Sequence, residues 1–555
     1  MTASTWWRPR RVAVAIAVAL LVALIAFVYR FNTLGGARGG FDNDHFVHLL
    51  RADMLLSGEQ PLRDFADAEL RGAWPSLGYE LSAWAQRLWG RNLLAEAYLT
   101  VGALALAAAI AFLVAVDLSR RWSVALLAVA CIIAAGPKLY NYEKVVVLVV
   151  AIALVRLWCL KPTITRVALL AVWTVAAGLI RHDYGVYVGV ASIVAIVVRH
   201  MGRRPVVRDV GAYVGIAVVL LLPSLIWIQT YQGIGSYIQV TLASVRGESS
   251  RTALITPTFD LSAGVDESNL LALTYYAFWA VVLVTGLAFA WRLIKDRLKA
   301  ADVATVSALL ALAALVNAFF LRGNIGARFG DAIVPVAMLG AAAAALAPPL
   351  DGRPRLGAFA AWAAPALLVA IVMSVFVTVD IRAELATGGL SHSLENTTRR
   401  FQSTRAELRS LPPARWSADV KTPGTLVAAR YLAECTAPSD RVLVVTYAPE
   451  VPVFARRLFA AGQGTFGLTF YESDAQQDEA VARLRLQSVP IVLGAYEDFE
   501  GDFVQDYSRV AAYLASRYRD AGVIDVDDEP RFRVLVDNGR TPTGVDPHLG
   551  LPCFR

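Results

Sequence analysis

Long apolar stretches recur along this chain, and they constrain its fold more than any other feature. Reading for runs long enough to approach a bilayer crossing predicts eleven membrane spans. The predicted spans are Val12–Tyr29, Leu93–Val116, Val124–Ala135, Val145–Leu160, Val167–Ile180, Val186–Val198, Val210–Ile228, Leu271–Ala290, Val303–Phe320, Ala332–Leu346 and Leu356–Val379. Because 57% of the 555 residues are hydrophobic and only 17% are charged, a single soluble core could not bury them. The expected fold is therefore a polytopic α-helical membrane protein.

Positive charge in the short loops predicts the topology. If the N-terminus is inside, every inner loop carries at least two basic residues, beginning with Arg120 and Arg121. The formal net charge of +7 is therefore read as membrane orientation and not as affinity for nucleic acid. The first span lacks a small-residue cleavage site before Arg30, so it is read as a retained signal anchor. An odd number of spans places the C-terminus outside, and the composition suits a bacterial cytoplasmic membrane.

Three polar segments are predicted on the outer side: residues 30–92, 231–269 and 381–555. We therefore expect a transmembrane domain at 1–380 and an external domain at 381–555. In the first polar segment, apolar residues recur at helical spacing over 44–57 and 77–89, which predicts two helices on the membrane surface. The tail alternates strand-like and helix-like runs, which predicts a small α/β domain. The strand-like runs are Val442–Thr446, Ile491–Gly494 and Phe532–Val536, and the helix-like runs are Asp474–Leu486 and Val504–Tyr518.

The four cysteines divide by location. Cys131 and Cys159 fall in apolar runs and are expected to be inert packing residues. Cys435 and Cys553 fall in the polar tail, where an oxidising external compartment would favour a disulfide between them. The sequence contains no CxxC motif and no Cys/His spacing typical of a metal site.

A cluster of four polar residues follows the first span: Asp42, Asn43, Asp44 and His45. In a structural interpretation, Asp42 or Asn43 caps the following helix and Asp44 favours its positive end. In a catalytic interpretation, a carboxylate at the membrane boundary acts as a general base on an acceptor hydroxyl. His45 is a candidate substrate-binding residue. His45 and His48 could also tune that carboxylate or bind a metal, although no third ligand is defined.

Three further polar clusters are predicted at the outer ends of spans, where ionisable groups are costly unless they are paired or used. Their candidate substrate-binding residues are Lys138, Tyr142 and Lys144; Arg181, His182 and Asp183; and Arg322 and Arg328. Arginine and lysine suit a phosphate, which predicts an anion clamp. The alternatives are a tight turn closed by an Arg181–Asp183 ion pair, and arginines that snorkel to the interface.

Over about residues 10 to 380, these features resemble the GT-C class of integral-membrane glycosyltransferases. The likeness is to the branch of protein mannosyltransferases, lipid A aminoarabinose transferases and RgtA/B/C/D-like enzymes. Its motifs correspond here to Asp44-His45-Phe46, Ser57-Gly58-Glu59-Gln60-Pro61 and Trp74-Pro75-Ser76-Leu77. The class often has Asp-Glu or Asp-Asp, whereas this chain has Asp-Asn-Asp-His, so the base is Asp44 or Asp42; spacing to Gly58 favours Asp44.

The resemblance implies transfer of a sugar from a polyprenyl-phosphate donor to a glycan, lipid or protein acceptor at the outer face of the membrane. It also implies that the basic residues at the outer span ends hold the donor phosphate. A divalent metal ion could assist. Neither a Walker GxxxxGK[ST] motif nor a GxGxxG motif opening a helix is present.

Two alternatives come from other functional classes. A transporter or flippase would need polar or helix-breaking positions near the bilayer midplane, but most apolar runs have uncharged centres. A non-catalytic envelope assembly protein would leave the clustered acidic and basic residues unexplained. The sequence therefore favours the glycosyltransferase.

Overall fold

The structure of the protein is a computed structural model. It describes residues 9–35, 39–65, 77–136, 138–201, 205–251, 257–260, 262, 264, 266–295, 298–318, 325–346, 366–368, 370–372, 381–391, 393–410, 424–464, 466, 472–495, 502–525 and 531–555. Packing divides the chain into two compact units. The first unit comprises residues 1–33, 100–223 and 248–401, and the second comprises 34–99, 224–247 and 402–555.

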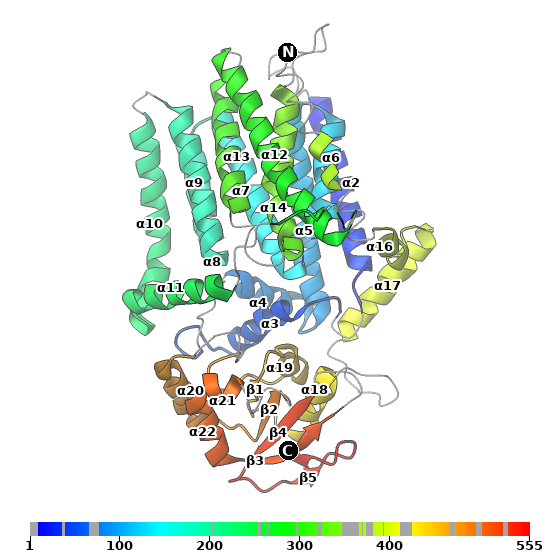
Figure 1. The fold of residues 1–555 in the computed structure, drawn as a ribbon, viewed down its shortest axis with the longest axis vertical. Helices are drawn as coiled ribbons and strands as arrows, with labels where there is room; N and C mark the ends of the chain where they lie inside the picture. The colour runs from blue at the N-terminus through cyan, green and yellow to red at the C-terminus, as the bar shows by residue number, and fades with distance from the viewer. Residues whose placement is uncertain are drawn as a thin grey trace. The chain divides into compact units, whose positions relative to one another are not determined.

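Ten of the eleven predicted spans correspond to helices. They are α2 (Pro9–Asn32), α5 (Leu93–Ser119), α6 (Trp122–Ala134), α7 (Tyr142–Leu160), α8 (Ile164–Ile180), α9 (His182–Arg199), α10 (Pro205–Tyr231), α12 (Glu267–Ile294), α13 (Ala300–Ala318) and α14 (Ile325–Leu346) (Figure 1). Most of the eleventh, Leu356–Val379, lies outside the described residues. In the described part of the chain, six helices are long and apolar enough to cross a membrane and three apolar helices are shorter. The chain is thus a multi-pass membrane protein, and the count of eleven stays a prediction.

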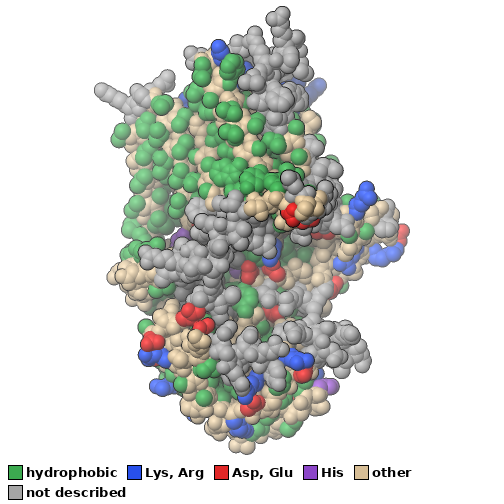
Figure 2. Space-filling view, in the orientation of Figure 1, with side chains coloured by type: hydrophobic (Ala, Val, Ile, Leu, Met, Phe, Trp, Pro, Cys, Tyr) green, Lys and Arg blue, Asp and Glu red, His purple; other side chains and the backbone are tan. Residues whose placement is uncertain are grey.

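The helices of the first unit expose apolar side chains, as lipid-facing surfaces require. Leu20 and Leu24 on α2 are 65% and 59% exposed. Figure 2 shows hydrophobic side chains gathered over α9, α10 and α13. Where α8 and α9 meet, a Cβ on Gly185 would lie 2.5 Å from Gly178 Cα, so only glycine permits this close packing. Helix α16 (Ile381–Thr387) belongs to the first unit, and α17 (Leu394–Ser410) begins in it and ends in the second.

A buried ionic network joins three helices of the first unit. The Arg156 guanidinium on α7 donates from Nε to Asp117 Oδ2 on α5 at 2.6 Å, and from Nη1 to Asp302 Oδ1 on α13 at 2.7 Å. The Arg156 side chain is only 5% exposed, and Thr305 Oγ1 accepts a further hydrogen bond from it. A charge buried this deeply is tolerated because carboxylates surround it.

The second unit joins the predicted surface segment to the tail. Both predicted surface helices are present as α3 (Asn43–Leu56) and α4 (Leu77–Trp89). Leu50 and Met54 of α3 form a buried cluster with Phe65 and Phe459, so residues separated by about 400 positions share one core. On α4, Trp84 and Leu88 are 61% and 69% exposed, which suits a helix on a membrane surface. Helix α11 (Ile234–Arg251) lies in the predicted outer segment 231–269.

A four-stranded mixed sheet of order β1-β2-β4-β3 organises the tail. Strand β1 (Leu443–Val445) is parallel to β2 (Ile491–Ala495), whereas β4 (Phe532–Asp537) is antiparallel to both β2 and β3 (Tyr518–Ile524). Helices α20 (Asp474–Leu486) and α22 (Ser508–Arg517) pack on it through a core that includes Leu484 and Leu514. The predicted α/β domain is confirmed.

Several elements of the tail differ from the predicted ones. The run Val504–Tyr518 is divided between α21 (Asp502–Asp506) and α22, and its last residue begins β3. The pattern missed β3, α18 (Gly424–Cys435), α19 (Glu450–Ala455) and the small pair β5 (Gly544–Val545) and β6 (Pro552–Cys553). Strand β3 has only its two end residues fully buried, so it lacks the apolar alternation on which prediction depends.

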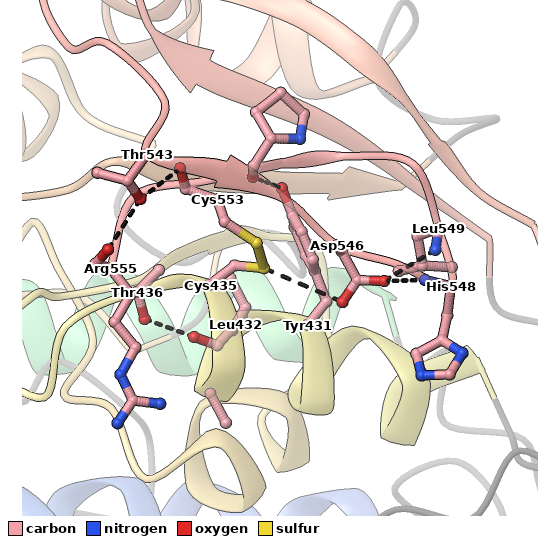
Figure 3. The surroundings of a disulfide bond; sticks show 12 residues. Tyr431, Leu432, Cys435, Thr436, Thr543, Asp546, His548, Leu549, Cys553 and Arg555 are labelled. Atoms are coloured by element: carbon pink, nitrogen blue, oxygen red, sulfur yellow. Dashed lines mark hydrogen bonds between the residues drawn. A yellow bond between two sulfur atoms is a disulfide. The ribbon is translucent and has the colours of Figure 1, made fainter.

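The expected disulfide between Cys435 and Cys553 is present, and Cys131 and Cys159 are free and buried as predicted. The bridge links the end of α18 to β6 (Figure 3). Beside it, the Tyr431 hydroxyl donates to the carbonyl of Pro552 at 2.6 Å. Burial raises the pKa of Tyr431, which keeps this phenol a neutral donor.

Removing this disulfide is expected to destabilise the second unit. The bridge closes a segment of 118 residues, so a Cys435→Ser, Cys553→Ser variant should lose about 2–5 kcal/mol of unfolding free energy. Thermal unfolding of the full chain with and without dithiothreitol measures the loss. Reductant should lower the midpoint of the wild type and leave that of the double variant unchanged; a wild type insensitive to reductant would contradict this expectation.

Candidate functional site

The predicted base, Asp44, lies in the first turn of α3 and is half-buried. The hydroxyl of Tyr447, from the segment between β1 and α19, donates a hydrogen bond to Asp44 Oδ1 at 2.5 Å. A phenol that donates to a carboxylate stabilises its ionised form and limits its rotation. The second unit therefore holds one carboxylate oxygen of Asp44 in place.

The next residue, His45, connects α3 to the start of α5. Its imidazole is 1% exposed, and its Nε2 lies 3.0 Å from Oε2 of the fully buried Glu96. The same carboxylate accepts hydrogen bonds from Ser82 Oγ at 3.0 Å and from Gln86 Nε2 at 2.8 Å. Three side chains thus satisfy one buried carboxylate, which locks α3, α4 and the start of α5 together. His45, predicted to bind substrate, is committed to this network.

Asp42 occupies the N-cap position of α3 with extended backbone, at φ −97° and ψ 173°. Its side chain makes no capping hydrogen bond, and its carbonyl accepts one from the backbone N–H of His45 at 3.0 Å. The ring centroids of His45 and His48 are 6.3 Å apart. Among the described residues, no group of three His, Cys, Asp or Glu side chains is placed to hold a metal ion.

Side chains from the tail also contact the loop after α3, which carries the Ser57–Pro61 motif. Arg441 forms an ion pair with Glu59, and Arg483 donates to the carbonyl of Asp64. The Trp227 indole N–H donates to the carbonyl of Pro61 at 3.1 Å. Within the second unit, the motif is therefore held from several directions.

Two of the predicted basic clusters meet in the first unit. Tyr142 and Lys144 are buried at the start of α7, and Lys144 is close enough to Asp183 to interact with it electrostatically. Arg181 donates from Nε and Nη2 to the two carboxylate oxygens of Asp183, each at 3.1 Å. The ion-paired turn is thus the geometry found at the α8–α9 junction.

The remaining predicted residues occupy varied positions. Lys138 is exposed, with its ammonium 5.6 Å from the ring centroid of Tyr140. His182 is half-buried at the first position of α9. Arg322 lies outside the described residues, and Arg328 falls in α14, where its side chain is not described.

Sequence reasoning missed Tyr447, Glu96, Ser82 and Gln86. Glu96 carried a usable signal, because a carboxylate in an apolar run demands a partner. Tyr447 carried none, since it lies in a loop about 400 residues from Asp44. Only the tertiary fold brings them together.

The chain matches no family model and no curated protein sequence. Among solved structures, ArnT from Cupriavidus metallidurans matches in a crystal structure bound to undecaprenyl phosphate and in another in the apo state. Each alignment has 14% sequence identity and a TM-score of 0.48 and covers 96% of this chain, with 99% and 98% of the respective ArnT chains. At this level of similarity, the residues of the site carry the functional argument.

Proposed function

We propose that the protein is a membrane glycosyltransferase that moves a sugar from a polyprenyl-phosphate donor to a glycan, lipid or protein acceptor at the outer face of the cytoplasmic membrane. The observation that carries the proposal is Asp44, a half-buried carboxylate oriented by Tyr447 at 2.5 Å and set on a helix locked by the His45–Glu96 pair. Preorganisation of this kind is what a general base requires. The motif resemblance to GT-C enzymes falls on the same residue.

The proposed reaction is a single displacement at the anomeric carbon. Asp44 accepts the proton of the acceptor hydroxyl while the acceptor oxygen forms a bond to that carbon. The bond between the carbon and the phosphate oxygen breaks, its electron pair leaves with the polyprenyl phosphate, and the anomeric configuration inverts. Lys138, Lys144, Arg181, Arg322 and Arg328 retain their predicted role of stabilising the departing phosphate.

The disulfide supports the external placement of the tail. Cysteine pairs persist as disulfides in oxidising compartments and stay reduced in the cytosol, so the Cys435–Cys553 bridge favours a periplasmic second unit. With the predicted odd number of spans, the N-terminus then lies inside, as the loop charges also predict. Catalysis at the outer face follows, because Asp44 belongs to the same unit as the bridge.

The proposal is tested with the purified chain in lipid and a panel of labelled polyprenyl-phosphate sugars. Release of free polyprenyl phosphate is measured with and without an acceptor extract. Turnover of one donor identifies the sugar. If no donor turns over, a transporter or an envelope assembly protein becomes the better reading.

Tyr447→Phe is expected to lower kcat about tenfold, because a charge-assisted hydrogen bond stabilises the ionised base. The acid limb of the pH–rate profile should also move to higher pH, a shift that a merely structural role would not produce. Tyr518→Phe is the matched control: it removes a hydroxyl that donates to the Val489 carbonyl at 2.9 Å in the same unit. An unchanged profile in Tyr447→Phe would remove the hydroxyl from the mechanism.

A further inference from the structure

A pocket in the second unit is lined in part by polar residues that the proposed reaction does not use. It lies where α3, the start of α5 and the end of α19 meet. Asp53 on α3, Arg91 before α5 and Arg456 after α19 line it, with Asn92 and Leu93 beside them. All belong to one compact unit, so the pocket is defined by that unit alone.

Two arginines at this pocket have guanidinium groups whose hydrogen-bond donors can bind a ligand. Arg91 and Arg456 are exposed, and neither guanidinium makes a hydrogen bond or salt bridge within the described part of the chain. Their neighbour Arg457 differs: it is 8% exposed, and its guanidinium donates to the carbonyls of Ala433 and Thr436 at 2.9 and 2.7 Å. Arg457 is therefore structural, whereas the other two can serve a ligand.

The backbone at Arg456 supports a functional reading. Arg456 ends α19 in the left-handed conformation, at φ 54° and ψ 44°. Glycine or asparagine usually occupies this position, because other side chains are strained there. Binding of a ligand by the Arg456 guanidinium would explain why an arginine occupies this strained position in the pocket wall.

The charges of the pocket favour an anion with two negative charges. Arg91 and Arg456 are close enough to Asp53 to interact with its carboxylate electrostatically, and the positive end of α5 begins at Leu93. Burial and the nearby Glu96 raise the pKa of Asp53 to about 6, against the opposing effect of the two arginines. The pocket thus becomes more positive as pH falls through that value.

We infer that this pocket is a binding site for a phosphomonoester group, held between Arg91 and Arg456. The planar guanidinium fork suits phosphate oxygens, and the two guanidinia, with Arg457 also lining the pocket, outweigh the single carboxylate of Asp53. The phosphate could belong to a lipid headgroup or to a soluble molecule. The inference is independent of the proposed transfer reaction, and its test measures binding only.

The test is calorimetric titration of the full chain in phosphatidylcholine nanodiscs. The soluble probe is glycerol 3-phosphate, and the lipid probe is dioctanoyl phosphatidic acid. Arg91→Gln with Arg456→Gln should weaken binding about tenfold or more, because charge-assisted hydrogen bonds are lost. Arg87→Gln, an exposed arginine on α4 outside the pocket, is the matched control and should bind as the wild type does.

Each outcome decides something. Loss of glycerol phosphate binding in the double variant supports a soluble ligand, loss of phosphatidic acid binding alone supports a lipid, and loss of both supports recognition of the phosphate itself. Failure of the wild type to bind either probe, or equal binding by wild type and double variant, would overturn the inference.

A second variant tests the role of Asp53. Asp53→Asn removes a negative charge that opposes the ligand and should tighten binding about fivefold at pH 7.5. The advantage should vanish near pH 5, where the wild-type carboxyl is also neutral. Because a phosphomonoester itself takes up a proton near pH 6, the two proteins are compared at each pH. An equal affinity at pH 7.5 would exclude Asp53 from the site.

Discussion

Asp44→Asn is expected to reduce sugar transfer about 100- to 10,000-fold, the contribution that a positioned general base makes. The amide keeps the size of the side chain and can still accept the hydrogen bond that Tyr447 donates at 2.5 Å. It cannot accept the proton of an acceptor hydroxyl. Donor binding and membrane insertion should therefore persist while release of polyprenyl phosphate falls by the same factor.

Asp42→Asn is the matched comparison, because it changes a carboxylate two residues away at the N-cap of the same helix. Its effect should be small if Asp44 is the base. A severe loss of transfer in Asp42→Asn together with near-normal transfer in Asp44→Asn would show that Asp42, and not Asp44, is the general base. Undiminished transfer in both would remove the acidic cluster from the mechanism.

Arg156→Ala is expected to destabilise the first unit by about 3–5 kcal/mol. The substitution leaves the buried carboxylate of Asp117 with only its ion pair to Arg120, and it breaks the link between α7 and Asp302 of α13. Breaking a buried ion pair from one side costs more than the pair contributes, because the remaining charge keeps its desolvation penalty. Thermal unfolding of the full chain in detergent should show a much lower midpoint.

Arg399→Ala supplies the control. Arg399 pairs with Glu395 across one helical turn, but the two side chains are 70% and 80% exposed. Exposed pairs contribute about 0–1 kcal/mol, so this midpoint should barely move. Similar losses in the two variants would show that the Arg156 network has no special structural weight. A charge-neutral Arg156→Met variant separates the lost charge from lost packing.

The membrane character of the chain was readable from sequence because hydrophobic run length is a local property. Ten of the predicted spans coincide with helices, and α3 and α4 begin and end within a residue of the predicted limits. The two internal strands β2 and β4 were predicted from their apolar runs, whereas β3, with its exposed middle, was not. Prediction succeeded where burial leaves a continuous local pattern.

The candidate site shows the limit of local reasoning. The sequence located the acidic cluster that contains Asp42 and Asp44, and Asp44 as the base stays a prediction. It also offered the Cys435–Cys553 pairing, which the structure contains. Tyr447 and the pocket formed by Arg91 and Arg456 depend on contacts between distant segments, which carry no local signal. The sequence by itself determined that the chain spans the membrane and at which positions its carboxylates occur. Hydrophobicity and charge are properties of individual residues, so they can be read without the fold. Only the tertiary structure decided which partners orient those carboxylates, because hydrogen bonds and ion pairs form between groups that folding brings within about 3 Å.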